Sequence, residues 1–158
     1  MDERERVIDD IATHYERLGL SGTASRVIAV LVLEPSGSAD APTLVARLGV
    51  AKSSMSVALA TLERYGLVTR FRAAGDRRER YLLAEDAFEA VFLSKFPALQ
   101  SFLELADRGL RLAEPGSDSY RRLQRMREFY AFMLREFPAL LQRWQAEAEA
   151  GELSRQES

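Results

Sequence analysis

The sequence contains no cysteine and a single histidine, His14. Without cysteine there can be no disulfide, no thiolate metal ligand and no cysteine nucleophile. One histidine among 158 residues also argues against a zinc site of the usual kind, which takes several histidine or cysteine ligands. We therefore expect neither a bound metal nor a cofactor.

Long apolar runs are missing as well. The longest, VIAVLVL at 27–33, is far shorter than the ~20 residues that a membrane span needs. The acidic start, MDERERVIDD, lacks the apolar centre of a signal peptide. We therefore expect a cytoplasmic protein with no membrane partner. The sequence also offers no nucleophile–base pair, metal-ligand set or glycine-rich phosphate loop, so an enzyme is not expected.

Charge is present in quantity but unevenly spread. Residues 1–43 carry a net charge of −4, residues 44–83 a net charge of +5, and residues 84–158 a net charge of −3. A positive segment within an acidic chain indicates a localised anionic partner, and nucleic acid is the usual one. A solvated face without a partner is the alternative interpretation.

Hydrophobic spacing predicts two helices before the positive segment. Ile8, Ile11, Tyr15 and Leu18 recur every three or four residues, and Gly19 ends this first helix. The second helix starts with Ser21 or Thr23 as its cap and ends near residue 34. Because it is apolar nearly all round, we expect it at the centre of the domain.

Two short helices with a tight turn are predicted next. The first spans about 40–48, Gly49 supplies the turn, and the second runs over 52–65. The second helix has an apolar stripe and an opposite face that begins with Lys-Ser-Ser at 52–54. Such a short polar face can approach base edges, and its first amides can meet a phosphate. The arrangement is typical of a helix-turn-helix.

A basic hairpin follows. The strand-length runs 67–72 and 79–83 are joined by a loop that contains Gly75 and Asp76. A basic hairpin directly after a helix-turn-helix is a wing, and a wing can place an arginine in the minor groove. We expect the Asp76 carboxylate to hold Arg78, two residues on, and to fix its guanidinium.

The remainder is predicted to be helical. A helix over 84–112 must kink or restart at Pro97, and Ser117 or Asp118 caps the final helix. That helix carries apolar residues with a period of seven, which is typical of packing along another helix. FPAL, found at 96–99 and 137–140, marks either two kinks or a coincidence. Apolar stripes at both ends of the chain predict a homodimer through Ile8, Ile11, Leu123, Met126, Tyr130, Met133, Phe137, Leu140 and Trp144.

The predicted fold is mainly α with a small β-hairpin wing. Residues 1–20 form the N-terminal helix of a dimerisation region, and residues 21–84 form a winged helix-turn-helix DNA-binding domain. Residues 85–150 form a C-terminal helical dimerisation arm, and residues 151–158 are expected to fray into a flexible tail.

The segment from Ala41 to Leu83 resembles the winged helix-turn-helix of MarR-type bacterial transcription regulators, above all in RLGVAKSSMS, LERYGLV and GDRR. The layout outside it is similar to the GbsR-like branch and to actinobacterial members that control efflux of lipophilic compounds. The resemblance implies a homodimeric repressor that binds a palindromic double-stranded DNA operator. Two departures stand out: Val45 occupies a position where the family often has a smaller residue, and the absence of cysteine excludes thiol-based oxidation sensing.

Site residues follow from the same resemblance. DNA contacts fall on the second short helix and on the wing, at Lys52, Ser53, Ser54, Ser56, Val57, Arg72, Asp76, Arg77 and Arg78, and the charge pattern adds Arg64, Arg70 and Arg80. The family releases DNA when a small molecule binds between the DNA-binding and dimerisation parts. A lipophilic or aromatic effector, or a quaternary ammonium ion in an aromatic cage, would here meet Tyr15, Leu18, Phe88, Phe92, Phe96, Phe102, Phe129 and Phe132.

A protein–protein adaptor without a DNA site is the alternative function. Winged helices can serve either purpose, but an adaptor has no need of five arginines on one hairpin. The salt dependence of DNA binding separates the two, because each neutralised phosphate contributes about −0.9 to its slope.

Overall fold

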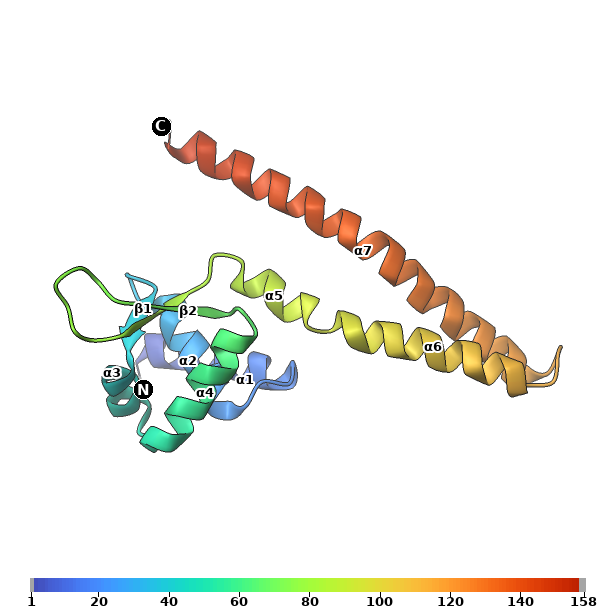
Figure 1. The fold of residues 1–158 in the computed structure, drawn as a ribbon, viewed down its shortest axis with the longest axis horizontal. Helices are drawn as coiled ribbons and strands as arrows, with labels where there is room; N and C mark the ends of the chain where they lie inside the picture. The colour runs from blue at the N-terminus through green and yellow to red at the C-terminus, as the bar shows by residue number, and fades with distance from the viewer. Residues whose placement is uncertain (1, 157–158) are drawn as a thin grey trace. The chain divides into compact units, whose positions relative to one another are not determined.

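The computed structural model describes residues 2–156, apart from the side chain of Leu153. Its elements form two compact units, residues 1–91 and 92–158, which are shown in Figure 1. Among the described residues no helix has the length and apolar character to cross a membrane. The structure is mostly helical with one small sheet, so the predicted fold class is confirmed.

Two helices form the centre of the first unit. Helix α1 spans Glu3–Arg17 and packs on α2, Gly22–Leu33, which is buried along almost its whole length. The side chain of Ser21 accepts a hydrogen bond from the backbone N–H of Ala24, as expected of an N-cap. The predicted central position of the second helix is therefore confirmed.

A three-stranded antiparallel sheet completes this unit. Strands β1 (Ser38–Asp40), β2 (Val68–Phe71) and β3 (Arg80–Leu83) lie in the order β1-β3-β2. Sequence patterns predicted β2 and β3 but not β1, because three residues are too few to show alternation. Strand β1 pairs with β3, with Ala39 opposite Tyr81, and so ties the wing to the core.

The second unit is a helical hairpin. In this hairpin α6, Phe96–Leu112, packs along α7, Asp118–Gln156. The short helix α5, Ala87–Leu93, leads into α6 and contains the boundary between the two units. Pro97 lies in the first turn of α6, so the predicted restart there is confirmed. Ser117 is the cap of α7, since its hydroxyl accepts a hydrogen bond from the N–H of Tyr120.

Apolar residues that recur every seven positions in α7 pack on α6 of the same chain. Leu123 lies against Gly109 of α6, where an added Cβ would stand 2.8 Å from a Leu123 methyl carbon. Further along, the Tyr130 ring stacks on a phenylalanine of α6 at 5.1 Å between centroids. The phenylalanines of the two FPAL segments meet edge to face at 5.1 Å. Three of the seven α7 residues of the predicted dimer interface therefore pack on α6 of the same chain.

Two further expectations need correction. Ile8 is only 1% exposed and belongs to the core of the first unit, so it has no surface to offer a second copy. Residues 151–156, expected to fray, continue α7. Glu152, Arg155 and Gln156 are residue types that favour helix, and the Ser154 hydroxyl donates to the Ala150 carbonyl one turn earlier. Residues 157–158 of the expected tail, and Met1 of the first helix, lie outside the described residues.

Candidate nucleic-acid interface

The turn between the two short helices has the predicted geometry. Helix α3, Ala41–Leu48, is followed by Gly49 with φ 62°, a left-handed conformation that glycine adopts without strain. Helix α4, Lys52–Arg64, starts three residues later, and its four inward side chains, from Met55 to Leu62, are buried. The buried stripe fixes which face of α4 is left for a partner.

The exposed face of α4 is short and polar at its beginning. Lys52, Ser53, Ser54 and Ser56 are all exposed, and Val57 is 68% exposed. The preceding residue, Ala51, has no side-chain oxygen to cap the first turn, and no acidic residue lies in that turn. The positive end of the helix dipole and its first amides therefore face outward without a neutralising group, as a phosphate contact requires.

The wing loop is closed by a turn at Gly75, whose φ is 82°. The N–H of Asp76 donates to the Ala73 carbonyl at 3.0 Å, and the Asp76 carboxylate accepts from the N–H of Arg78 at 2.9 Å. The contact between Asp76 and the Arg78 guanidinium is longer, at 3.7 Å. Asp76 thus shapes the loop backbone more than it holds the guanidinium.

A buried carboxylate outside the wing holds the Arg78 guanidinium more closely. Asp40, which is 4% exposed, lies 3.3 Å from Arg78 and caps α3 by accepting from the N–H of Thr43 at 2.8 Å. Arg78 itself remains 72% exposed. The guanidinium is therefore anchored at one edge and free at its outer edge to meet a ligand.

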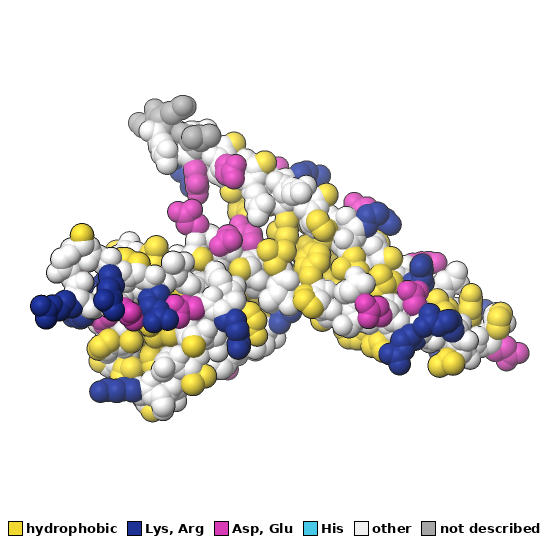
Figure 2. Space-filling view, viewed as in Figure 1, with side chains coloured by type: hydrophobic (Ala, Val, Ile, Leu, Met, Phe, Trp, Pro, Cys, Tyr) yellow, Lys and Arg dark blue, Asp and Glu magenta, His cyan; other side chains and the backbone are white. Residues whose placement is uncertain are grey.

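Three other arginines of the predicted DNA-binding set are bonded to protein groups in this structure. Arg70 makes two contacts with Glu63 and one with Glu79, and Arg72 contacts Glu79 at 3.1 Å. Arg80 is partly buried and donates to the carbonyl and hydroxyl of Ser38 on β1. Figure 2 shows the acidic side chains among the basic ones at the wing end of the first unit.

The remaining basic residues are outward-facing. Arg77 is exposed in the wing loop and makes no ion pair with any described residue. Arg64, at the end of α4, lies over the ring of Tyr65 at 5.4 Å. The side chains most open to a polyanion are therefore the first residues of α4 together with Arg77 and Arg78.

The carboxyl of Asp40 has a shifted pKa. Hydrogen bonds from Thr43, and after them the charges of Arg78 and Arg80, lower the pKa of Asp40, although burial acts in the opposite direction. The carboxylate form therefore contributes stability above the ordinary carboxyl range, near pH 4, and this contribution is lost as the pH falls below it.

Asp40→Ala is expected to lower the free energy of unfolding by about 1–2 kcal/mol near neutral pH, because the α3 cap is lost. The difference from the wild type should shrink as the pH falls from about 4 through the lowered pKa of the wild-type Asp40 carboxyl. Urea unfolding at both pH values measures this. Asp40→Asn is the control, since asparagine keeps the cap but not the charge, and its loss should be smaller. An alanine effect independent of pH would show that the charge of Asp40 has no part in stability.

The aromatic residues expected to line a ligand site are divided between the two units. Tyr15 is half-buried on α1, and burial raises its pKa, while Leu18 and Phe88 are exposed. In the second unit the side chains of four phenylalanines are about half exposed: Phe92, Phe102, Phe129 and Phe132. Phe96 is partly buried against Phe137 of α7.

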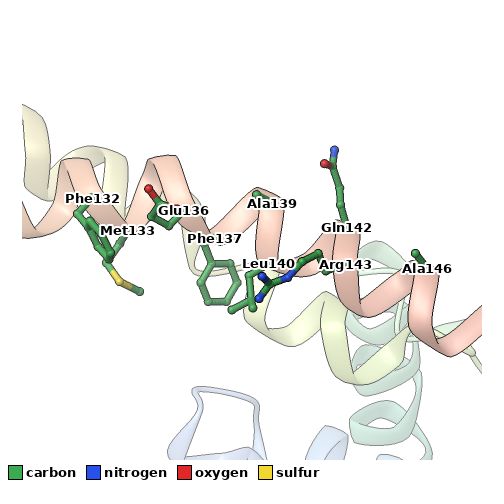
Figure 3. Close-up of a pocket in the computed structure, with 9 residues that line it drawn as sticks. All are labelled: Phe132, Met133, Glu136, Phe137, Ala139, Leu140, Gln142, Arg143 and Ala146. Atoms are coloured by element: carbon green, nitrogen blue, oxygen red, sulfur yellow. The ribbon is translucent and has the colours of Figure 1, made fainter.

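A shallow apolar groove runs along α7. Phe132, Met133, Phe137 and Leu140 line it, and Figure 3 shows Phe137 and Leu140 pointing from the same side of the helix while Gln142 points away. Leu140 and Trp144 are each 51% exposed. This side of α7 offers more apolar surface than a single helical hairpin covers.

Three acidic residues of the site were missed by sequence reasoning. A signal existed for Glu79, because a hairpin that pairs Phe71 with Arg80 brings Arg72 and Glu79 opposite each other. Glu63 and Asp40 had no such signal. Glu63 meets Arg70 only because α4 ends beside β2, and Asp40 meets Arg78 only because β1 joins the sheet.

Comparison with known proteins gives a consistent pattern. Residues 18–79 match a family model described as the MarR family, and residues 86–147 match one described as MmpR5-like MarR family transcriptional regulators. HTH-type transcriptional regulator MmpR5 of Mycobacterium tuberculosis (strain ATCC 25618 / H37Rv) is 28% identical over 127 residues, which cover 80% of this chain and 77% of that protein. A crystal structure of a transcriptional regulator is 26% identical with a TM-score of 0.71, covering 92% and 99% of the two chains.

Proposed function

Because the chain belongs to the MarR family of winged helix-turn-helix transcriptional regulators, we propose that it is a homodimeric repressor that leaves a palindromic operator when a small lipophilic ligand binds. DNA binding and transcription regulation come with the family, which consists of regulators and not of enzymes. Repression, dimerisation and ligand release are the proposed steps.

One observation carries the proposal. The uncapped start of α4, with Lys52 and three exposed serines, belongs to the same compact unit as a wing that presents Arg77 and Arg78. A helix start of this kind suits the major groove, and the outer edge of the Arg78 guanidinium suits a narrow minor groove. These contacts read two neighbouring grooves of one duplex.

The exposed apolar side of α7 supports dimerisation. The groove residues and Trp144 together leave an aromatic and aliphatic stripe that a second copy of the hairpin would cover. Two copies related by a twofold axis would present two recognition helices, and a palindromic operator has the matching symmetry.

A lipophilic effector is the chemistry that the available side chains favour. The half-exposed phenylalanines Phe92, Phe102, Phe129 and Phe132 offer aromatic surface for such a ligand. Apolar and aromatic walls of this kind are usual in small-molecule sites. The resemblance of the sequence to actinobacterial regulators of lipophilic-compound efflux supports the same class of ligand.

Fluorescence anisotropy tests the proposal. The labelled duplexes come from upstream of the protein's own gene and its neighbours, with a scrambled duplex as control, over a range of salt concentrations. We expect tight binding to one duplex, a clear excess over the scrambled one, and a steep salt dependence. Weak, equal binding to all duplexes with a flat salt slope would favour the adaptor.

Arg78→Ala is expected to weaken operator binding by at least ~1 kcal/mol and to reduce any preference for A·T-rich flanking sequence. The reason is that the outer edge of this guanidinium is exposed while Asp40 holds the inner edge. Anisotropy with duplexes that differ only in their flanks measures both effects. Arg155→Ala, which removes an exposed arginine near the end of α7, is the control. Unchanged affinity for every flank would remove the wing from the mechanism.

A further inference from the structure

We propose that Glu63 and Glu79 hold Arg70 and Arg72 on the protein surface, away from DNA phosphates, and thereby set the preference of this protein for its operator over other DNA. This inference rests on the proposed function, since it requires the wing to lie on DNA.

The contacts join α4, β2 and the wing loop. Arg70 of β2 donates through Nε and Nη2 to the two carboxylate oxygens of Glu63, at 2.9 and 3.1 Å. Its third nitrogen, Nη1, donates to Glu79 at 3.3 Å. Glu79 uses its other oxygen to accept from Arg72 at 3.1 Å. The recognition helix, through Glu63 near its C-terminal end, is thus linked to both sides of the wing.

Every nitrogen of the Arg70 guanidinium is occupied by a carboxylate. The two-point contact with Glu63 has the fork geometry in which arginine also recognises phosphate. Hydrogen bonds to Glu63 first, and then to Glu79, raise the pKa of Arg70, while those from Arg72 and Arg70 lower the pKa of Glu79. The two glutamates therefore occupy the places that phosphate oxygens would take.

Arginines that are paired with glutamates help the protein to discriminate between DNA sequences. A contact between an arginine and phosphate is the same on every duplex, so it strengthens operator and non-operator binding alike. If two wing arginines are engaged by glutamates, the contacts that remain come from α4 and from Arg77 and Arg78. A larger share of the binding free energy then depends on base sequence and groove shape.

The test compares Glu79→Gln with the double variant Glu63→Gln/Glu79→Gln on a scrambled duplex. The single change frees Arg72 but leaves Arg70 on Glu63, whereas the double change frees both. We expect the salt slope to steepen by about 0.9 per protomer for the single variant and about 1.8 for the double variant. Scrambled-DNA affinity of the double variant should rise at least about tenfold near 50 mM salt, and the operator-to-scrambled ratio should fall.

A matched control separates this effect from a general gain of positive charge. Glu85→Gln removes the same charge just after β3, from an exposed residue that makes no ion pair with the described part of the chain. It should leave the slope within experimental error of the wild type. Equal slopes for the double variant and Glu85→Gln would overturn the inference, as would a loss of affinity in the double variant.

A further variant, Arg77→Ala, distinguishes a failure of the role given to the glutamates from a failure of the proposed contact between the wing and DNA. A flatter slope in this variant places the wing on DNA, and an unchanged double variant then contradicts only the role of the glutamates. A slope unchanged by Arg77→Ala as well contradicts the contact between wing and DNA, and with it the proposed function of the wing. Melting temperatures of all variants confirm that the compared proteins are folded.

Discussion

A Ser53→Glu variant is expected to lose DNA affinity by more than about a hundredfold, because like charges brought together at an interface cost several kcal/mol. Ser53 is exposed at the second position of α4, on the face that is left open by the buried stripe. A carboxylate there would meet phosphate where a neutral hydroxyl and a helix N-terminus now stand. Anisotropy with the operator duplex measures the loss.

The same substitution should not destabilise the fold. A negative charge in the first turn of a helix interacts favourably with the helix dipole, by about 0.3–1 kcal/mol. The variant is therefore expected to melt at or slightly above the wild-type temperature. Loss of binding combined with undiminished stability cannot be explained by unfolding, which makes this change more informative than the removal of a buried residue.

Ser119→Glu is the matched control. Ser119 is the second residue of α7, is exposed, and carries the same side chain in the same helical position in the other unit. DNA affinity should stay within about twofold of the wild type, as for an ordinary surface substitution. If Ser53→Glu binds as well as Ser119→Glu, α4 is not the recognition helix.

The helices of this protein were predictable because each has a local signal. Apolar spacing marked the buried side of α4, Ser21 marked the start of α2, and Pro97 marked the start of α6. These signals depend on backbone geometry within a few residues. The residues that open α4 were therefore predictable as an exposed set.

Features that depend on long-range pairing were not predictable. Strand β1 exists because β3 offers it hydrogen bonds, and its own three residues carry no pattern. The ion pairs of Arg70 and Arg78 join residues 7 and 38 positions away, respectively. Sequence alone therefore showed five arginines on a hairpin but not which of them are already bonded to acidic groups.

The seven-residue period of α7 was ambiguous for a related reason. A heptad pattern indicates that a helix packs along a second helix, but it does not show whether the second helix belongs to the same chain. Here α6 supplies the partner for Leu123, Tyr130 and Phe137. The half-exposed residues of α7, such as Leu140 and Trp144, are what remains for a second copy.

Met133→Glu is expected to raise the dissociation constant of the dimer by at least about a hundredfold, since a buried charge without a partner costs about 3–5 kcal/mol. Met133 lies in the apolar groove between Phe132 and Phe137, where a second copy would enclose it. Operator affinity should fall with it, because two recognition helices bind far more tightly when linked than when separate. Sedimentation velocity and anisotropy measure the two effects.

Two companion variants make the result specific. Met133→Leu keeps the groove apolar and should remain dimeric. Leu140→Glu places the charge on a residue that is already 51% exposed in one chain, so it should leave the hairpin folded while still disrupting a dimer. If both glutamate variants stay dimeric while their melting temperatures match the wild type, the α7 groove is not the interface. A second copy would then have to use the exposed aromatic residues of α5 and α6 instead.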